Sequence, residues 1–305
     1  MIPVEASLAI ARSTQGLIVR RSLGPYQLVR RLGRGGMAEV HLATSFGASG
    51  FQRTVAIKTL APELVGNAEL ERALIHEATL AGKLHHRNLV AVLGLGVDDG
   101  LYYVVMEYVD GGDLAGARLP EPLALHVVCE LALGLAYLHA ARDERGLPLG
   151  IVHRDISPSN VLVSSTGDVK LADFGIAKAT ALEEITAAGT RKGTYAYMSP
   201  EQLAGEAVTP ASDQFGLAVT LVEMITGTRP FSGDTPWAVM EAIRAGASQL
   251  DGLASDVESI VRIALAPDAS ARFETIDAFR GALDDARRAR QPAGTAEFAA
   301  WLVRR

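Results

Sequence analysis

Short apolar runs separated by glycine-bearing turns dominate residues 26–109 of this sequence. Their β-branched and aromatic content predicts strands, at 26–32, 40–44, 54–60, 90–97 and 102–108. Between the third and fourth runs, a periodicity near 3.6 residues predicts a helix over 67–84. The pair Gly111-Gly112 is then expected to close this sheet-rich part of the chain.

After Pro122 the pattern becomes mostly helical. Apolar positions at helical spacing predict helices, at 123–141, 211–228, 236–247, 254–266 and 274–290. Residues 151–200 are instead typical of loops and short strands. The chain is therefore expected to form a small β-lobe at 26–109 and a larger, mainly helical lobe at 110–287. A ligand site is expected where two such lobes meet, because ligand pockets favour domain junctions.

Two end segments flank this core of 26–287. Residues 1–25 are a weakly patterned leader that ends at the turn signal Gly24-Pro25. Residues 288–305 end in the sequence EFAAWLVRR, which predicts a short amphipathic helix. We expect this helix to dock on the folded core at 26–287 rather than to anchor in a membrane, because a helix so short would bind a lipid surface weakly, and a partner-binding tail is the alternative.

Composition narrows the class of protein. Of the 305 residues, 49% are hydrophobic and 21% are charged, a balance typical of a folded globular chain. The formal net charge of −6 gives no global basic field, so no nucleic-acid partner is expected. Cys129 is the only cysteine, which excludes an intramolecular disulfide and a multi-cysteine zinc site. A reducing, cytoplasmic compartment is the simplest expectation.

The sequence predicts no membrane insertion. The apolar run between Glu130 and Arg142 is shorter than the ~20 residues that span a bilayer. No basic segment followed by an apolar stretch and a small-residue cleavage pattern is visible at the start. We therefore expect a protein that is not integral to the membrane.

A glycine-rich loop, G-R-G-G-M-A at 33–38, precedes the strand predicted to begin at Val40. Such a loop can be a plain hairpin turn or a phosphate-binding loop. A dinucleotide-binding fingerprint is disfavoured, because it needs a helix after the loop rather than a strand. A Walker loop is excluded, because the only Gly-Lys pair, Gly82-Lys83, is followed by leucine.

Lys58 ends the apolar sequence V-A-I-K. A lysine in an apolar strand is costly unless it finds an anionic partner. It could lie on an edge strand and point to solvent, or it could pair with Glu77 on the predicted helix. The second arrangement would direct Lys58 toward the phosphates of a nucleotide.

Three further motifs follow in order: H-R-D-I-S-P-S-N at 153–160, D-F-G at 173–175 and S-P-E at 199–201. Together with the glycine loop and V-A-I-K, they resemble the signature set of the protein kinases in order and spacing. The sequence G-G-M-A-E-V resembles bacterial serine/threonine kinases, and the catalytic loop resembles myxobacterial ones. The resemblance covers about residues 26–287. It implies an α+β, bilobal fold with a small antiparallel sheet plus one helix, followed by a helical lobe.

The resemblance also implies transfer of the γ-phosphate of ATP to serine or threonine hydroxyls of proteins, with Mg²⁺ as cofactor. Asp155 would accept the proton of the attacking hydroxyl. Lys58, paired with Glu77, would contact the α- and β-phosphates. Asn160 and Asp173 would supply oxygen ligands to Mg²⁺, which prefers carboxylate and carbonyl oxygen.

The residues that would surround the nucleotide come from both predicted lobes. Those implied by the resemblance are Leu32, Gly33, Gly35, Gly36, Val40, Ala56, Met106, Glu107, Val109, Asp113 and Leu162. The three glycines would cover the phosphates, and Met106 would be the gatekeeper before the adenine-reading backbone of 107–109. Asp113 could contact the ribose or, equally, act as a helix N-cap.

Other matches have structural roles by the same resemblance. Arg272 is expected to pair with Glu201, and Asp213 is expected to brace the catalytic loop through backbone N–H groups. His153 is expected to be a packed core histidine. Cys129 is expected to be a buried helix residue that packs in the core as a small apolar side chain.

The catalytic loop departs from the family pattern at Ser157, where serine/threonine kinases usually carry a lysine. Tyrosine kinases instead have an arginine two residues later, and here that residue is Ser159. The linker at 141–150 is also longer than usual. These departures leave open a pseudokinase that binds ATP and acts as a scaffold. A small-molecule kinase is a weaker alternative, because the S-P-E segment resembles a protein-substrate groove.

Arg154 before the catalytic aspartate implies control by phosphorylation of the segment 176–198. Thr186 and Thr190 are the expected autophosphorylation sites, and two copies of the chain could meet during that reaction. Thr194 is expected to contact Asp155 instead and to help select serine and threonine acceptors.

Overall fold

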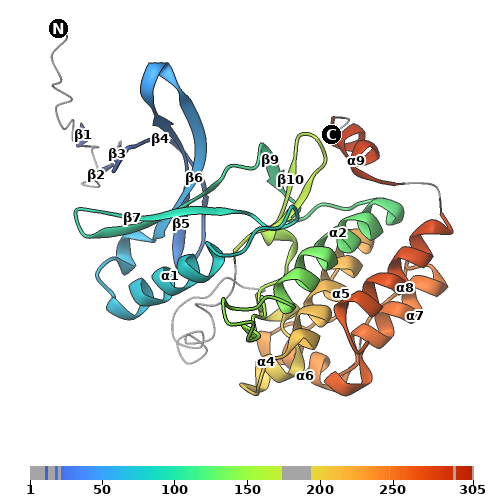
Figure 1. Cartoon of the computed structure of the whole chain (residues 1–305). Coiled ribbons are helices and arrows are strands. Elements are labelled where there is room, and N and C mark those ends of the chain that lie inside the picture. Colours follow the sequence, from blue (N-terminus) through green and yellow to red (C-terminus); the bar gives the residue numbers. More distant parts are fainter. Residues whose placement is uncertain are drawn as a thin grey trace, which may run out of the picture. The chain divides into compact units, whose positions relative to one another are not determined.

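The computed structural model divides the chain into two compact units, Met1–Gly82 with Val92–Tyr108, and Lys83–Ala91 with Val109–Arg305 (Figure 1). It describes residues 22–173, 194–246, 248–290 and 293–303, together with the backbone of 11–12 and 18–19. In the described backbone, β1 (Ala11–Arg12) pairs with β2 (Ile18–Val19).

The N-terminal unit is built on a six-stranded antiparallel sheet with the order β3-β4-β5-β6-β8-β7. Its strands are β3 (Ser22–Leu23), β4 (Tyr26–Arg34), β5 (Ala38–Phe46), β6 (Gln52–Leu60), β7 (Val92–Asp98) and β8 (Leu101–Glu107). The helix α1 (Ala68–Ala81) packs against this sheet. The strand β6 is an inner strand, since it pairs with β5 on one side and with β8 on the other.

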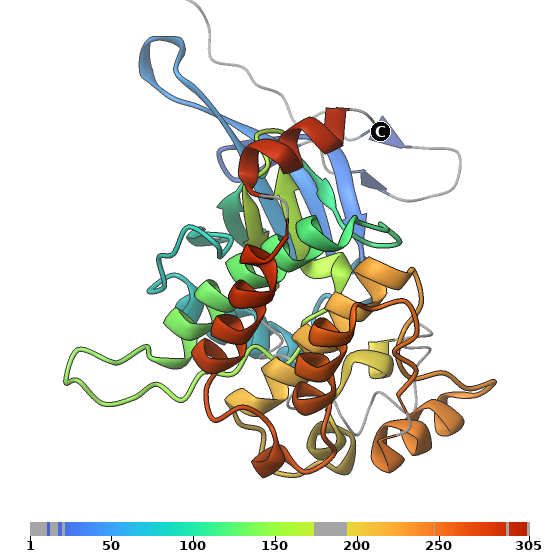
Figure 2. The same ribbon diagram turned by 90° about the vertical axis from the view of Figure 1, so that its right-hand side faces the viewer.

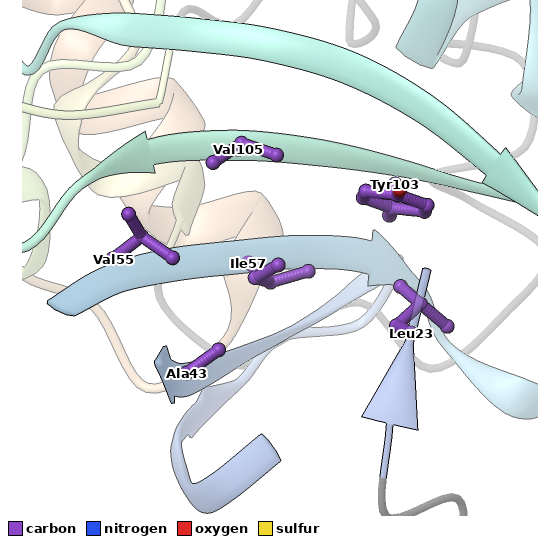
Figure 3. Close-up of a cluster of buried hydrophobic side chains, with 6 residues drawn as sticks. All are labelled: Leu23, Ala43, Val55, Ile57, Tyr103 and Val105. Carbon is purple, nitrogen blue, oxygen red and sulfur yellow. The ribbon is translucent and has the colours of Figure 1, made fainter. Parts of the chain in front are cut away.

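Alternation along β6 and β8 gives this sheet two buried faces. One face carries the cluster drawn in Figure 3, which consists of Leu23, Ala43, Val55, Ile57, Tyr103 and Val105. The other face carries Leu60 and Val104, which pack with three residues of α1, namely Leu70, Leu74 and Ala78. Lys58 alternates with Ile57 and pairs in register with Val104, so it lies on the face that α1 covers.

The observed ends of two elements differ from the predicted ones because of helix capping and strand pairing. The helix predicted at 67–84 is α1, which begins after Asn67 because the Asn67 side chain accepts from the backbone N–H groups of Glu69 and Leu70. The strand predicted at 90–97 begins only at Val92. The reason is that Val90 donates its N–H to the carbonyl of Leu171 in the C-terminal unit, at 2.9 Å.

The C-terminal unit is mainly helical. Its α-helices in the described residues are α2 (Glu121–His139), α4 (Pro200–Ala204), α5 (Pro210–Thr226), α6 (Pro236–Ala245), α7 (Ser255–Ala264), α8 (Ile276–Arg288) and α9 (Thr295–Val303). The helix α2 packs against α5 and α8 (Figure 2). The α+β fold predicted from the sequence is confirmed.

The helix α2 is more apolar than the sequence analysis allowed. By length and composition it could cross a membrane, with a mean hydropathy of 1.4, but 67% of that stretch is buried inside the structure. Cys129 lies on this helix and is buried, as predicted, and burial raises the pKa of its thiol to about 12. The packing of α2 is that of a core helix.

A second sheet in the C-terminal unit has the order β11-β10-β9 and is formed by β9 (Gly111–Asp113), β10 (Val161–Ser164) and β11 (Val169–Leu171). Gly111 and Gly112, predicted to close the sheet-rich part of the chain, belong to β9, which pairs with β10. A Cβ at Gly111 would overlap with the carbonyl of Val163 on β10. The close approach of β9 and β10 therefore needs glycine at that position.

Candidate active site

An ion pair joins β6 to α1 in the N-terminal unit. The Nζ atom of Lys58 lies 2.8 Å from Oε1 of Glu77, and the two side chains are 11% and 12% exposed. Because β6 is an inner strand, the alternative of an edge-strand lysine that points to solvent is excluded. The pairing predicted from the sequence is confirmed.

The glycine loop is the turn of the β4–β5 hairpin. Gly33 pairs with Val40, and the N–H of Gly35 donates to the carbonyl of Ala38 at 2.8 Å. A strand follows the loop, as the sequence predicted, and not the helix that a dinucleotide fingerprint requires. A Cβ at Gly33 or Gly36 would meet no protein atom within 4 Å. Packing within the protein therefore does not require glycine at these two positions.

Ion pairs fix the base of this loop. The Glu39 carboxylate, in a residue 8% exposed, lies 3.3 Å from the Arg31 guanidinium and 3.2 Å from that of Arg34. Arg34 also reaches Glu63, at 2.5 Å. This network, which no local sequence pattern predicts, ties the hairpin to the segment after β6.

The residues predicted to surround the nucleotide are divided between the two units. In the N-terminal unit, Ala56 lies directly opposite Met106 in the β6–β8 pairing. The others in that unit are Leu32 on β4, Val40 on β5 and Glu107 at the end of β8. In the C-terminal unit, Val109 opens the second segment, and Asp113 on β9 pairs in register with Leu162 on β10.

Asp113 is not a helix N-cap. Its Oδ1 accepts a hydrogen bond from the N–H of Ala115 at 2.9 Å, and the next helix begins only at Glu121. The carboxylate therefore stabilises a local turn at the end of β9.

The side chains of Asp155 and Asn160 are in direct contact in the catalytic loop. The Nδ2 atom of Asn160 donates to the Asp155 carbonyl at 2.7 Å and to Oδ2 of the Asp155 carboxylate at 2.8 Å. A short 3₁₀ turn, Pro158–Asn160, sets this geometry, since the Asn160 N–H donates to the carbonyl of Ser157 at 2.9 Å. The loop thus holds the carboxylate in one orientation.

Asp213 on α5 braces the same loop, as predicted. Its carboxylate accepts from the N–H groups of His153 and Arg154, each at 2.8 Å, and is 0% exposed. His139, at the end of α2, also approaches this carboxylate through Nε2 at 2.8 Å. His139 was not predicted as part of the site, because no local motif identifies it.

His153 is fully buried, which confirms its prediction as a core residue. Burial lowers the pKa of its imidazole, and the carboxylates of Asp213, Asp155 and Asp173 oppose that shift. Three of the acidic groups of the site therefore lie near one neutral ring.

Asp173 follows β11 by two residues and has a left-handed backbone, with φ 55°. Arg154 also has a positive φ, of 68°. Such conformations are unfavourable for residues other than glycine and concentrate at functional sites. The carbonyl of Asn160 accepts the N–H of Ala172 at 2.8 Å, which brings the segments of Asn160 and Asp173 together at the open end of the β10–β11 hairpin.

The donor chemistry at this end fits Mg²⁺. Asp173 offers a carboxylate, and the amide nitrogen of Asn160 is used by Asp155, so its Oδ1 is the atom available to a cation. No cluster of three or more His, Cys, Asp and Glu side chains that could hold a metal is found among the described residues. Mg²⁺ commonly needs only one or two protein carboxylates, with phosphate oxygens and water completing its shell.

Ser157 replaces the cation that the resemblance leads one to expect. Its residue is 7% exposed, and its hydroxyl shares a hydrogen bond of 2.9 Å with the hydroxyl of Ser159. The two serines that distinguish this loop therefore contact each other.

Arg272 pairs with Glu201, as predicted. Its Nη1 and Nη2 atoms contact the two carboxylate oxygens at 2.8 Å and 3.0 Å. Burial alone would raise the pKa of Glu201, but the hydrogen bonds from Arg272 and Ser212 outweigh it and lower the pKa to about 2.

Several predicted features lie outside the described residues: Phe174, Gly175, Thr186 and Thr190. Thr194 begins a 3₁₀ turn, Thr194–Tyr197, and its contact with Asp155 stays a prediction. The longer linker at 141–150 is a small hairpin, closed by a bridge between Arg142 and Pro148.

Comparison with known proteins agrees with this geometry. The family model described as "Protein kinase domain" matches residues 26–279. The chain is 40% identical over 93% of its length to the tyrosine-protein kinase MasK of Myxococcus xanthus, and covers 46% of that protein. It is 35% identical over 86% of its length to the serine/threonine-protein kinase PrkC of Bacillus subtilis, and covers 40% of it. The chain thus spans less than half the length of these two relatives.

Among solved structures, the kinase domain of PknI from Mycobacterium tuberculosis aligns with a TM-score of 0.63 at 28% sequence identity. The alignment covers 87% of this chain and 97% of that domain. The order of the motifs, the Lys58–Glu77 pair and the braced catalytic loop agree with these matches. The chain therefore belongs to the protein kinase family, with bacterial kinases among its relatives.

Proposed function

We propose that this chain is a protein kinase that transfers the γ-phosphate of ATP to hydroxyl groups of proteins. The observation that carries the proposal is the Asp155 carboxylate, held at 2.8 Å by Asn160 in a loop that Asp213 braces. A carboxylate fixed in this way is positioned to receive a proton from an acceptor hydroxyl.

The proposed reaction forms one bond and breaks another. The acceptor oxygen bonds to the γ-phosphorus while the bond from that phosphorus to the β–γ bridging oxygen breaks, and ADP leaves with the electron pair. The hydroxyl proton passes to Asp155. Lys58, oriented by Glu77, would contact the α- and β-phosphates, and the backbone of Gly33, Gly35 and Gly36 would cover them.

We propose that Asn160 and Asp173 hold Mg²⁺, which would neutralise phosphate charge when bound. By the family resemblance, Val40, Ala56 and Leu162 would contact the adenine. The complete proposed nucleotide set comprises Leu32, Gly33, Gly35, Gly36, Val40, Ala56, Lys58, Glu77, Met106, Glu107, Val109, Asp113, Leu162 and Asp173.

We propose serine and threonine as acceptors, because relatives such as PrkC are named serine/threonine kinases. MasK, which carries the name of a tyrosine kinase, makes tyrosine the competing acceptor. The same relative, from Myxococcus xanthus, supports assignment to a myxobacterial-like subfamily with the H-R-D-I-S-P-S-N loop.

The wider setting is also proposed. The kinase domain would comprise residues 26–287, between the leader at 1–25 and the tail at 288–305. It would act in bacterial signalling in the cytoplasm, without a nucleic-acid partner and without integration into the membrane. Autophosphorylation at Thr186 or Thr190 would bring two copies of the chain together.

One observation favours the second candidate, a catalytically weak pseudokinase that binds ATP and acts as a scaffold. Ser157 and Ser159 bond to each other, and neither supplies a positive charge to the transferred phosphate. A missing cation can cost several kcal/mol of transition-state stabilisation.

Incorporation of label from γ-labelled ATP with Mg²⁺ distinguishes the two. The wild-type chain is compared with Asp155→Asn, with serine-, threonine- and tyrosine-containing acceptors. Labelling of protein acceptors that the substitution abolishes is expected. ATP binding without labelling, also when Thr186 and Thr190 carry acidic substitutions, would instead establish the pseudokinase. Labelling of small hydroxylated compounds but not of proteins would show a small-molecule kinase.

A further inference from the structure

The helix α9 packs on the turn that joins β10 to β11. Both views show α9 beside this hairpin (Figures 1 and 2). Gly167 in the turn has φ +88°, and a Cβ there would overlap with the carbonyl oxygen of Thr295 and lie 3.0 Å from the amide nitrogen of Ala299. The absence of a side chain at Gly167 is therefore what lets the backbone of α9 come this close.

Independent contacts fix α9 in this place. Phe298, near the centre of α9, is 0% exposed, so its side chain is buried against the rest of the structure. Before the helix, the carbonyl of Ala293 accepts from Nη1 of Arg287 on α8 at 3.0 Å. The segment after α8 is thus anchored at its start and buried at its centre, and the helix that the sequence predicted to dock does so.

Several hydrogen bonds hold the turn under α9. Oδ2 of Asp168 accepts from the hydroxyl of Thr166 at 2.7 Å and from that of Ser164 at 3.1 Å. Ser165 adds a bond from its N–H to the carbonyl of Asp110, next to β9, at 2.5 Å. Because these bonds connect the turn to the end of β10 and to the residue before β9, a displacement of the turn is expected to displace these strands as well.

The β10–β11 hairpin connects this turn to the proposed metal ligands. Asn160 directly precedes β10, and Asp173 follows β11 by two residues. With only three paired positions between the strands, the paired part of the hairpin is ~10 Å long. β10 also pairs with β9, but the turn lies only a few residues from Asn160 and Asp173, so an element packed on the turn is close enough to influence the position of both.

We propose that α9 holds the β10–β11 hairpin in the geometry that places Asn160 and Asp173 for Mg²⁺, with Gly167 and Phe298 as positioning residues. This inference rests on the proposed function, because it takes Asn160 and Asp173 as the metal ligands. The tail is then a part of the nucleotide site that acts from the opposite end of a short hairpin.

The substitution Gly167→Ala tests the proposal, with Gly146→Ala as the matched control. Both glycines lie in turns with positive φ, but a Cβ at Gly146 meets no atom within 4 Å. The two variants therefore share the backbone strain and differ in the clash with α9. Phe298→Ala is a second route to the same release, because it removes the buried side chain without changing the turn.

Two quantities are measured on the full chain. Hydrogen exchange of 295–303 reports whether α9 is docked. Calorimetric Kd values for ATP, with Mg²⁺ and with a chelator, give the affinity that the metal adds. We expect Gly167→Ala and Phe298→Ala to release α9 and to reduce this metal-dependent gain by about 3- to 30-fold. The metal-free Kd and the Gly146→Ala variant stay near wild type, and the double variant adds little to either single one.

A merely structural role for α9 would lower thermal stability without changing the metal-dependent gain, and that result would overturn the proposal. So would wild-type protection of 295–303 in Gly167→Ala. If the wild-type chain itself shows no metal-dependent gain, the proposed function of Asn160 and Asp173 fails first. An unchanged gain in a variant whose α9 is released overturns only the positioning role.

Discussion

Lys58 and Glu77 form an ion pair at 2.8 Å between an inner strand and the only α-helix of the described N-terminal unit. Both side chains are almost nine-tenths removed from solvent. Such a pair is weak support for stability, because desolvation offsets much of the attraction. Its position in the fold is better explained by orientation of the ammonium group toward a ligand.

Replacement of Lys58 by methionine is therefore expected to reduce phosphoryl transfer by about 100-fold or more. The fold should also lose stability, because the Glu77 carboxylate stays buried after Lys58 is removed, so transfer is compared per folded molecule. Steady-state transfer and thermal unfolding check the two effects. Lys83→Met, an exposed lysine in the C-terminal unit, is the control and should behave as wild type. Equal loss in both variants would contradict the role of Lys58.

Replacement of Asp213 by asparagine should loosen the catalytic loop. The Asp213 carboxylate accepts hydrogen bonds from two backbone N–H groups and lies 2.8 Å from Nε2 of His139. The asparagine side chain has one acceptor oxygen in place of two, so one of these donors would lose its acceptor. We expect a loss of ~1–3 kcal/mol in the free energy of unfolding. Transfer should fall at unchanged ATP affinity, because Asp213 acts on the loop of Asp155. Denaturant unfolding and calorimetry test this, and Asp234→Asn, an exposed carboxylate, is the control. Full activity in Asp213→Asn would exclude the bracing role.

The Glu201–Arg272 pair should make stability depend on acid pH. The pKa of Glu201 is about 2 in the folded chain, against an ordinary value of 4.5. Its ionised form therefore contributes stability above pH 4.5, and this contribution disappears as the pH falls toward 2. The difference in unfolding free energy between wild type and Glu201→Gln should be constant near neutral pH and shrink over that interval.

Salt provides the matched comparison for this pair. Asp256 also has a pKa lowered to about 2 by Arg290, but its side chain is 51% exposed. Each carboxylate makes a pH-dependent contribution to the free energy of unfolding, measured as the difference between wild type and Asp256→Asn or Glu201→Gln. High salt should suppress the contribution of Asp256 and leave that of Glu201 largely intact, because exposed charges are screened more strongly. The opposite order of salt sensitivity would argue that the Glu201 pair is hydrated.

The two serines of the catalytic loop should behave as one unit. If the only role of each hydroxyl is the hydrogen bond that the two share, either single substitution removes that bond. Ser157→Ala, Ser159→Ala and the double variant should then change the transfer rate by nearly the same factor, within about threefold. Transfer kinetics of the four proteins form a double-mutant cycle. Additive losses would show that each hydroxyl contacts the reaction separately.

The sequence could predict what local periodicity encodes. Alternation along 54–60 separates Val55 and Ile57 from Lys58, which sets the face on which Lys58 lies. The helix and its apolar face then make Glu77 the natural partner. The kinase motifs identified the bracing role of Asp213 only by resemblance, since the contact joins residues 59 and 60 positions apart.

Other parts could not be predicted because they depend on distant pairing. β9 has two glycines among its three residues, so it carries no apolar alternation, and only its contact with β10 makes it a strand. His139 reaches Asp213 across 74 positions. Docking of the tail helix was predicted, but its place on the β10–β11 turn was not, because that place depends on the missing side chain of Gly167, which in sequence looks like any other turn glycine.

The left-handed backbone of Arg154 and Asp173 has a consequence for protein engineering. Each conformation costs ~1–3 kcal/mol for a residue other than glycine. Glycine at either position would relieve that cost, but it would also remove the proposed Mg²⁺ ligand at Asp173 or the proposed phosphate-pairing side chain at Arg154. A screen that selects only for thermal stability would therefore retain glycine at these two positions even where it inactivates the protein. Library selections on this domain should be scored on phosphate transfer as well as on survival at high temperature.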